Sequence, residues 1–312
     1  MTSNNISDPA VAAYVSRVFG PQASVERTLE GVSALVYRLD RLPGVAYLRL
    51  GEAPDEDLST DAALLDHLRG LGVLVPEVIH VDPLDEALGR SVLVMSAIEG
   101  QHVGRCDDRE AARRVAHAAG AQLALLHSVQ VDGWGWVVRD GSWPLAGTWP
   151  EHGQFVWSEL PNTWPGDLSS VLAPAELEAL WTCFNEEPTS ELAPCLAHGD
   201  FDVTPIFYRH DGRYSGLINF GEIRGTEPTF DLGHFLLHDM ETAPWPLLED
   251  VLDGYASMNP GPAEDRAAIR RSALQLGTRQ LARWFKRFGP QRAPGLPLVQ
   301  GRVQRLRELL SA

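Results

Sequence analysis

The chain has 312 residues, 44% hydrophobic and 22% charged, which is ordinary for a globular protein of one large or two modest domains. Its formal net charge of −16 argues against a nucleic-acid partner, because affinity for a phosphate backbone needs clustered cations. No apolar run approaches the roughly 18 residues that span a bilayer, and the N-terminus MTSNNISDPA lacks the basic and apolar regions of a signal peptide, so we expect a cytoplasmic protein without a membrane partner.

The N-terminal third is predicted to be a five-stranded sheet with one inserted helix. It is preceded by a short amphipathic helix, which begins at Asp8 and ends at Gly20. A helix over 58–72 is indicated by leucines at helical spacing. Runs rich in β-branched and aromatic residues predict the strands, which form an antiparallel meander and then two more strands: 23–31, 33–40, 44–51, 76–82 and 91–100.

From Asp107 the pattern becomes that of a mostly helical second lobe. An acidic cap opens a helix that continues to His127. Six of the nine tryptophans lie between 134 and 164 amid Gly and Pro, in a segment that is either an irregular cap over the core or the wall of a ligand site. Further helices are predicted at 174–186, 246–256, 262–288 and 298–311.

The segment HGDFDVTPIFYRHDGRYSGLINFGE at 198–222, with DLGHF at 231–235, carries the clearest motifs. These motifs and the order of elements resemble the aminoglycoside phosphotransferase and choline kinase family over nearly the whole chain. The resemblance implies an α+β, two-lobed protein-kinase-like fold, with a nucleotide-binding lobe at 1–99 and a helical lobe at 100–312 that holds the catalytic loop and the substrate site. No hydrolase, Walker, zincin or dinucleotide-binding signature competes with it.

The HGD motif suggests the catalytic residue. In the family its Asp accepts the proton of the substrate hydroxyl, and the matching residue is Asp200. A carboxylate suits this role because a metaphosphate-like transition state needs an oriented nucleophile more than a strong base. The plain alternative is a loop aspartate bonded to backbone.

Two positions where the family has metal ligands depart from its pattern. One is Pro205, which offers no side-chain ligand atom, and the other is Asn219, whose neutral amide is a poorer Mg²⁺ ligand than a carboxylate. Glu222 is a candidate replacement, although a local hydrogen bond is the simpler interpretation. We therefore expect Mg²⁺ to be held weakly, mainly through the phosphates of the nucleotide.

On the sheet lobe the resemblance indicates a phosphate site. Gly31 and Ser33 match a short turn that offers backbone and hydroxyl groups to phosphate. Arg49 occupies the strand position that meets the α- and β-phosphates, and Asp61 is its expected carboxylate partner, with Glu56 as the fallback. The alternatives are a hairpin glycine and a solvent-facing strand arginine. Since the chain has a single lysine, an arginine is the expected cation.

The run LVMSAIEG at 93–100 resembles the hinge between the lobes. Backbone groups from Ser96 to Ile98 would meet the edge of an adenine, with Met95 behind it. A buried edge strand has the same composition, so the position in the chain is the only support for the hinge.

Other residues are given structural roles. Asp231 is expected to support the HGD loop, and His234 and His238 to pack without binding zinc, since no carboxylate or Cys completes a zinc pattern. The three cysteines are expected to be buried thiols, because neither their number nor their spacing suits disulfides or a metal: Cys106, Cys183 and Cys195.

Three functions remain open. The first is transfer of the γ-phosphate of ATP or GTP to a hydroxyl of an aminoglycoside-like molecule, an amino alcohol or a sugar. The second is a pseudokinase that binds a nucleotide or small molecule without transfer, and the third is a biosynthetic assembly partner that recognises a peptide or carrier-bound substrate through the tryptophan-rich segment. The acidic surface suits a cationic small molecule, although solubility explains it equally well. The intact Asp200 favours the first function, and the two altered metal positions favour the second.

Overall fold

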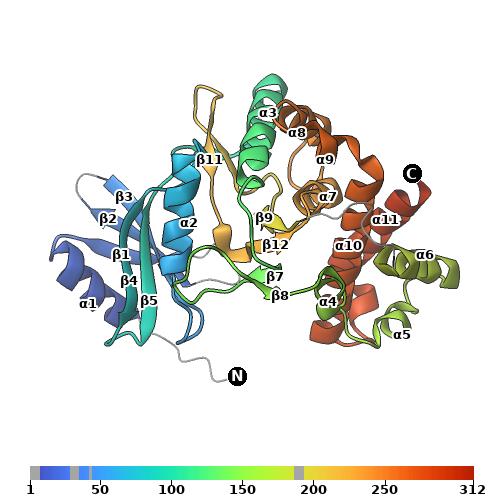
Figure 1. Ribbon diagram of the computed structural model, residues 1–312, viewed down its shortest axis with the longest axis horizontal. Helices are drawn as coiled ribbons and strands as arrows, with labels where there is room; N and C mark the ends of the chain where they lie inside the picture. The colour runs from blue at the N-terminus through green and yellow to red at the C-terminus, as the bar shows by residue number, and fades with distance from the viewer. Residues whose placement is uncertain (1–7, 29–34, 42–43, 186–192) are drawn as a thin grey trace.

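The computed structural model describes residues 8–28, 35–41, 44–185 and 193–312. It has two lobes, a smaller one built on a sheet and a larger one made mostly of helices (Figure 1). The predicted two-lobed α+β architecture is confirmed. The lobe boundary expected between residues 99 and 100 stays a prediction.

The described strands are β1 (Ser24–Arg27), β2 (Leu35–Arg41), β3 (Gly44–Leu50), β4 (Val78–Asp85), β5 (Arg90–Ser96), β6 (Gln101–His102), β7 (Trp134–Val137), β8 (Gly147–Trp149), β9 (Cys195–Ala197), β10 (Ile206–Tyr208), β11 (Tyr214–Leu217) and β12 (Arg224–Thr226). Of the later strands, only one at INFGE (218–222) was expected; the structure instead ends β11 just before this motif and has a 3-10 turn over Phe220–Glu222. The others were not predicted, because runs of two to four residues are too short to show an alternating pattern.

The described helices are α1 (Asp8–Phe19), α2 (Ser59–Gly70), α3 (Arg109–Leu126), α4 (His152–Ser158), α5 (Trp164–Leu168), α6 (Pro174–Asn185), α7 (Thr229–His238), α8 (Leu248–Ala256), α9 (Pro260–Glu264), α10 (Arg266–Phe288) and α11 (Pro297–Ser311), with 3-10 turns η1 (Val103–Arg105), η2 (Phe220–Glu222) and η3 (Ala293–Gly295). The helix predicted over 262–288 is broken at Asp265, whose side chain caps α10 by accepting from the Ala268 N–H. None of the described helices is long and apolar enough to cross a membrane.

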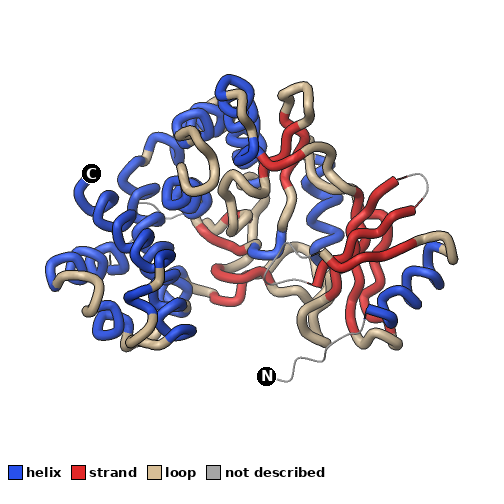
Figure 2. Tube along the Cα trace, turned by 180° about the vertical axis from the view of Figure 1, so that it is seen from behind, coloured by secondary structure: helices blue, strands red, loops and turns tan. Residues whose placement is uncertain are grey.

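The N-terminal sheet has the predicted five strands in the order β1-β2-β3-β5-β4, all paired antiparallel. Side chains alternate between its two faces, so Leu48 and Val94 pack on α1 while Leu93 packs toward α2. Figure 2 shows the sheet between these two helices. Arg49 is opposite Leu93 in the register and therefore lies on the α2 face.

In the helical lobe, α3 packs on α8 and α7 packs on α10 (Figure 1). The tryptophan-rich segment mainly caps this core: Trp134 and Trp164 are buried, and Trp157 packs against Trp181 with ring centroids 5.2 Å apart. Core capping is therefore the better interpretation of these tryptophans.

The three cysteines are free thiols; Cys106 and Cys195 are buried, whereas Cys183 is half-buried.

The segment after β7 joins the two lobes. The backbone N–H of Asp57 donates to the Arg139 carbonyl at 2.9 Å, and the Gly141 N–H donates to Thr60 Oγ1 at 3.0 Å. The ring of Trp143 lies 5.0 Å from that of His67 on α2. Residues that follow α3 in sequence thus contact α2 both at its start and in its last turn.

Candidate active site

The HGD loop, at residues 198–200, is held in place by a buried carboxylate of helix α7. Asp231, on α7, accepts hydrogen bonds from the backbone N–H groups of His198 at 2.7 Å and Gly199 at 2.8 Å, and from His127 Nε2 at 3.0 Å. Burial acts to raise the pKa of Asp231, but the hydrogen bond and charge of His127 and the bond from Gly199 bring it below the usual value. Asp231 thus has the supporting position expected for it.

Gly199 lets this loop lie directly on the turn formed by residues 218–222, which we call the INFGE turn. Its φ is +86°, and a Cβ added there would overlap the carbonyl oxygen of Glu222. His198 adds a second link, since its Nε2–H donates to the Ile218 carbonyl at 2.9 Å. The sequence neighbours of Asp200 and Asn219 are therefore held in contact.

The carboxylate of Asp200 is hydrogen-bonded to Asn219, which occupies a position where the family has a metal ligand. Asn219 Nδ2 donates to Asp200 Oδ2 at 2.9 Å, and the Asp200 side chain remains 37% exposed. His234 Nε2 lies 3.5 Å from Oδ1, while its Nδ1 lies 3.1 Å from the Phe201 carbonyl, which can only accept. Burial lowers the pKa of His234 to about 4, so this ring is neutral near pH 7 and leaves the negative charge of Asp200 unpaired.

The expected metal residues do not build a metal site of their own. Among the described residues no group of three His, Cys, Asp or Glu side chains could hold an ion. Glu222, the candidate replacement, accepts from Arg224 at 3.1 Å, and burial raises its pKa. Asn219 has a left-handed backbone (φ 69°) that this residue type tolerates. Asp200 and the Asn219 amide oxygen are thus the donors left for a cation.

Pro205 also has a backbone role. It is buried, and its carbonyl accepts from the Ile218 N–H at 3.1 Å. This bond joins the end of the HGD loop to the strand that leads to Asn219. The residue holds the loop at the position where the family supplies a ligand.

Arg49 and Asp61 are brought together as expected. Arg49 donates to Asp61 Oδ1 at 2.9 Å and to Glu56 Oε1 at 3.3 Å, so the fallback partner is present as well. The side chains of Arg49 and Asp61 are 9% and 2% exposed. Arg49 is therefore a buried, paired residue and not a solvent-facing one.

Arg139 is a site residue that the sequence did not reveal. It donates from Nε to Asp61 Oδ2 at 2.8 Å and from Nη2 to the carbonyls of Phe220 at 3.1 Å and Gly221 at 3.0 Å. It thus links helix α2 to the turn that follows Asn219. No motif includes this residue, and only the path of the segment after β7 brings it here.

The hinge stretch is partly engaged in the sheet. The Ser96 N–H donates to the Glu77 carbonyl at 2.8 Å, so this expected donor is already used. Ile98 N–H forms no hydrogen bond with any described residue, and Met95 is half-buried on β5. The Ala97 N–H donates to the Val45 carbonyl at 3.4 Å, so Ile98 is the residue of the expected set Ser96 to Ile98 whose N–H is free within the described residues. Gly31 and Ser33 lie outside the described residues.

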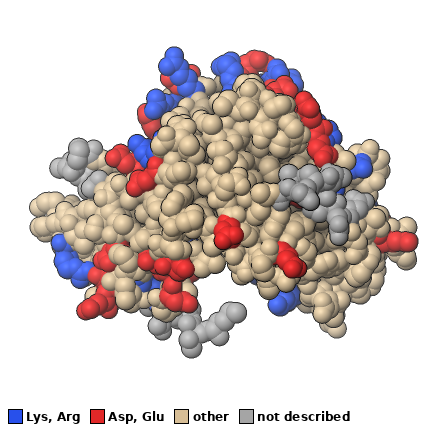
Figure 3. Space-filling model, viewed as in Figure 1, with Lys and Arg blue, Asp and Glu red and all other residues tan. Residues whose placement is uncertain are grey.

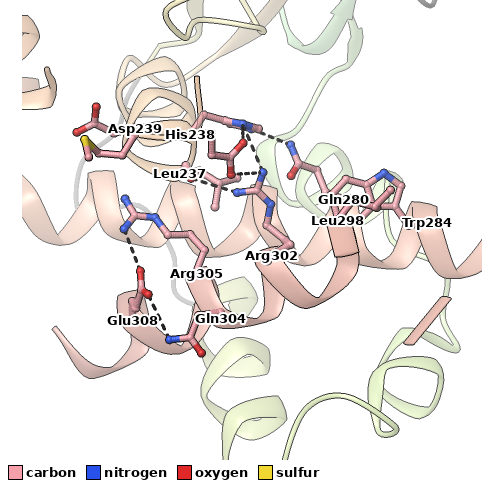
Figure 4. Close-up of a pocket in the computed structure, with 13 residues that line it drawn as sticks. Leu237, His238, Asp239, Gln280, Trp284, Leu298, Arg302, Gln304, Arg305 and Glu308 are labelled. Carbon is pink, nitrogen blue, oxygen red and sulfur yellow. Dashed lines mark hydrogen bonds and ion pairs between the residues drawn. The ribbon is translucent and has the colours of Figure 1, made fainter. Parts of the chain in front are cut away.

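A pocket of about 190 Å³ opens beside Asp200. We call it the acceptor pocket, and it is lined by Glu159, Gly199, Asp200, Asn219, Glu222, Arg224, His234, Leu276, Arg279, Gln280 and Arg283. A larger pocket of about 610 Å³ lies between the end of α7 and helices α10 and α11, and Gln280 lines both. Figure 4 shows Gln280 and Arg302 converging on His238 in this larger pocket.

Comparison with known proteins agrees with the fold described above. The chain resembles solved structures of a thermostable mutant of aminoglycoside phosphotransferase APH(4)-Ia, without ligands (16% identity, TM-score 0.68, 95% of this chain and 98% of that one) and in a ternary complex with ADP and hygromycin B (16%, 0.68, 96% and 98%). It also resembles macrolide 2′-phosphotransferase MphH from Brachybacterium faecium (18%, 0.57, 95% and 97%). No curated protein matches the chain by sequence. Because the model of the phosphotransferase enzyme family matches residues 24–270, the chain belongs to that family.

Proposed function

We propose that the protein is a phosphotransferase that moves the terminal phosphoryl group of ATP or GTP to a hydroxyl of a small molecule. The observation that carries the proposal is the position of Asp200. Its loop is fixed by Asp231, while its carboxylate reaches the acceptor pocket, partly exposed and beside a neutral His234. A carboxylate in this setting can orient a hydroxyl and accept its proton.

The transfer step follows from this placement. The acceptor hydroxyl oxygen attacks the terminal phosphorus, the bond from phosphorus to the nucleoside diphosphate breaks, and the hydroxyl proton passes to Asp200. His234 leaves the Asp200 charge unpaired, and Asn219 fixes the carboxylate through Oδ2. The remaining oxygen, Oδ1, is then the one that would receive the proton.

The sheet lobe has groups that suit a nucleotide, which would supply the phosphoryl group. Arg49 is held by two carboxylates, yet its buried Nε has no hydrogen-bond partner among the described residues. An arginine fixed in this way can bind phosphate oxygens with little further loss of side-chain conformational entropy. Ile98 would offer its N–H to the edge of the base.

A protein-held Mg²⁺ does not fit the described residues, since Glu222 is paired with Arg224 and Pro205 has no side-chain ligand. Loss of one tuned electrostatic contact to a transferring phosphate costs on the order of 3–4 kcal/mol, or about a hundredfold to a thousandfold in rate. The costs of the two altered positions, Pro205 and Asn219, need not add, because both positions would bind the same ion. We therefore expect slow turnover.

The second candidate function is binding without transfer. It is favoured by the hydrogen bond from Asn219 to Asp200. If residue 219 were an aspartate, as in the family, two carboxylates would face each other and need a cation, whereas the Asn219 amide meets Asp200 without one. A nucleotide could then bind without productive chemistry. The third function, an assembly partner that uses the tryptophan-rich segment, loses support because Trp134 and Trp164 are buried.

The experiment begins with thermal unfolding in ATP, GTP or ADP, with and without Mg²⁺. Ligand at about 100 times its dissociation constant should stabilise the fold by roughly 2.7 kcal/mol. Release of nucleoside diphosphate is then compared among wild type, Asp200→Asn and the control Asp211→Asn, which alters an exposed turn between β10 and β11. Turnover lost in Asp200→Asn alone supports phosphotransfer. Binding with no turnover in any variant selects the second candidate, and no binding removes both.

A further inference from the structure

The acceptor pocket has a distinctive set of charges. Three carboxylates and three guanidinium groups line it: Glu159, Asp200, Glu222, Arg224, Arg279 and Arg283. A site for a polycation would need carboxylates in excess. On the face shown in Figure 3, acidic and basic side chains are interspersed, so the net charge of the chain does not indicate what this pocket accepts.

The carboxylates of the pocket already have partners. Glu222 accepts from Arg224 at 3.1 Å, and Glu159 lies 3.6 Å from Arg224 Nη1. Asp200 accepts from Asn219 at 2.9 Å. Burial acts to raise the pKa of Glu159, but the charges of Arg224 and Arg279 bring it below its usual value, so Glu159 stays ionised and paired. Little negative charge is left for a cationic ligand apart from that of Asp200.

The guanidinium groups, in contrast, have unused capacity. Arg279 is 3% exposed and donates from Nη2 to the Val156 carbonyl at 2.9 Å, but its buried Nε has no hydrogen-bond partner among the described residues, with Glu159 Oε2 at 3.8 Å. Arg283 is exposed and forms no hydrogen bond or ion pair with any residue that the structure describes. A buried donor without a hydrogen-bond partner, such as Arg279 Nε, is costly unless a ligand meets it.

The arginines also repel one another. The pKa of Arg279 is lowered to about 10, mainly by burial; Glu159 acts to raise it, while the charges of Arg224 and Arg283 act in the same direction as burial. Arg279 and Arg283 are four residues apart on α10, so they lie on the same face of this helix, and both line the pocket. An anion placed between these two side chains would relieve the repulsion and accept from their free donors.

We infer that the acceptor is an anionic hydroxy compound, whose carboxylate or phosphate binds Arg279 and Arg283 while a hydroxyl faces Asp200. This inference rests on the proposed function for the role of the hydroxyl, but the anion site itself does not. The planar guanidinium fork suits oxyanions. The buried Oε1 of Gln280, without a partner among the described residues, could accept from another hydroxyl at the passage to the larger pocket.

The test measures binding without nucleotide by titration calorimetry, with four pyranoses of similar size as probes: glucuronate, glucose 6-phosphate, glucose and glucosamine. We expect at least one anionic sugar to bind about tenfold or more tightly than glucose, and glucosamine to bind most weakly. The two anionic probes distinguish a carboxylate site from a phosphate site. Equal binding of all four, tighter binding of glucosamine, or no binding of either anion at millimolar concentration would overturn the inference.

The variants separate this pocket from general charge effects. Arg283→Gln should remove the preference for the anion and Arg283→Glu should reverse it toward glucosamine, whereas Lys286→Gln removes one positive charge from an exposed position of the same helix and should change nothing. An unchanged preference in both Arg283 variants contradicts the inference. Anion binding without phosphoryl transfer would keep the anion site and remove the proposed function; transfer to neutral or cationic acceptors without anion binding would do the opposite.

Discussion

The side-chain amide of Asn219 donates a hydrogen bond to Asp200 Oδ2 at 2.9 Å. Asn219→Asp replaces this donor with a second carboxylate while keeping nearly the same shape, and the left-handed backbone tolerates Asp. Without a cation the two carboxylates repel, so we expect lower thermal stability in EDTA and recovery with Mg²⁺. Mg²⁺-dependent nucleotide affinity should rise at the same time, as measured by titration calorimetry.

Two further variants test whether this change restores transfer. Pro205→Asn added to Asn219→Asp should raise nucleoside diphosphate release further, and Asp200→Asn should abolish the gain. Because Pro205 is buried and fixes the loop, activity is compared per folded molecule. If Asn219→Asp leaves Mg²⁺ and nucleotide binding unchanged, the ion lies elsewhere, and Glu222 is then tested next.

Arg49→Ala should weaken binding of a nucleoside triphosphate far more than binding of the bare nucleoside, because only the triphosphate carries the charge that the guanidinium would meet. Dissociation constants for ATP and adenosine are compared. Arg38→Ala is the control, since it removes an exposed arginine of the neighbouring strand that is paired with Asp40. Equal losses for both ligands would assign Arg49 to structure alone.

Arg139→Ala should lower the free energy of unfolding by about 2–4 kcal/mol, because the buried Asp61 loses one of its two arginines and the carbonyls of Phe220 and Gly221 lose a donor. Arg139→Lys should recover only part of the loss, since an ammonium group cannot span these acceptors. Denaturant unfolding gives the values. A double-mutant cycle with Asp61→Asn should show coupling, and strict additivity would contradict the link.

The sequence predicts the sheet lobe well because its strands are long enough to alternate. It also identifies Asp200, Asn219 and Asp231, because they lie in motifs of fixed spacing. Arg139 was missed for a physical reason. Its position depends on the backbone bonds that hold the segment after β7 against α2, and these join residues about eighty positions apart. Periodicity and local propensity carry no information on such contacts.

The charges of the acceptor pocket were hidden for a similar reason. Composition indicates an acidic chain, but the pocket draws Glu159 from the end of α4, Arg224 from β12 and Arg279 from α10. Pairing among them decides which charges remain free. Only the folded arrangement shows that guanidinium donors are in surplus.

Gly199→Ala should abolish nucleoside diphosphate release and destabilise the fold strongly, because the added methyl group would overlap the Glu222 carbonyl on top of the cost of a positive φ. Gly289→Ala is the matched control: its φ is +80°, but nothing lies within 4 Å of the added Cβ. Its backbone (φ 80°, ψ 154°) lies in a region that side chains rarely adopt, so Gly289→Ala should cost about 1–3 kcal/mol and keep activity. Similar losses in both variants would mean that contact between the HGD loop and the INFGE turn is unimportant.

His152, which does not line the acceptor pocket, gives a pH dependence that can be tested. Burial, and then the charges of Arg279 and Arg271, lower its pKa from 6.5 to about 4, and its ring packs 4.6 Å from that of Trp134. In the unfolded chain the ring takes up its proton near pH 6.5, so the unfolded state binds more protons between pH 6.5 and 4. The stability that depends on a neutral His152 is therefore complete above pH 6.5 and is lost as the pH falls through this range.

His152→Phe keeps an aromatic ring and cannot titrate. Between pH 7 and 5 the wild type should lose about 1 kcal/mol more than the variant, allowing for the partial exposure of the ring. Denaturant unfolding at several pH values measures the difference, and parallel pH profiles for the two proteins would show that His152 titrates equally in both states.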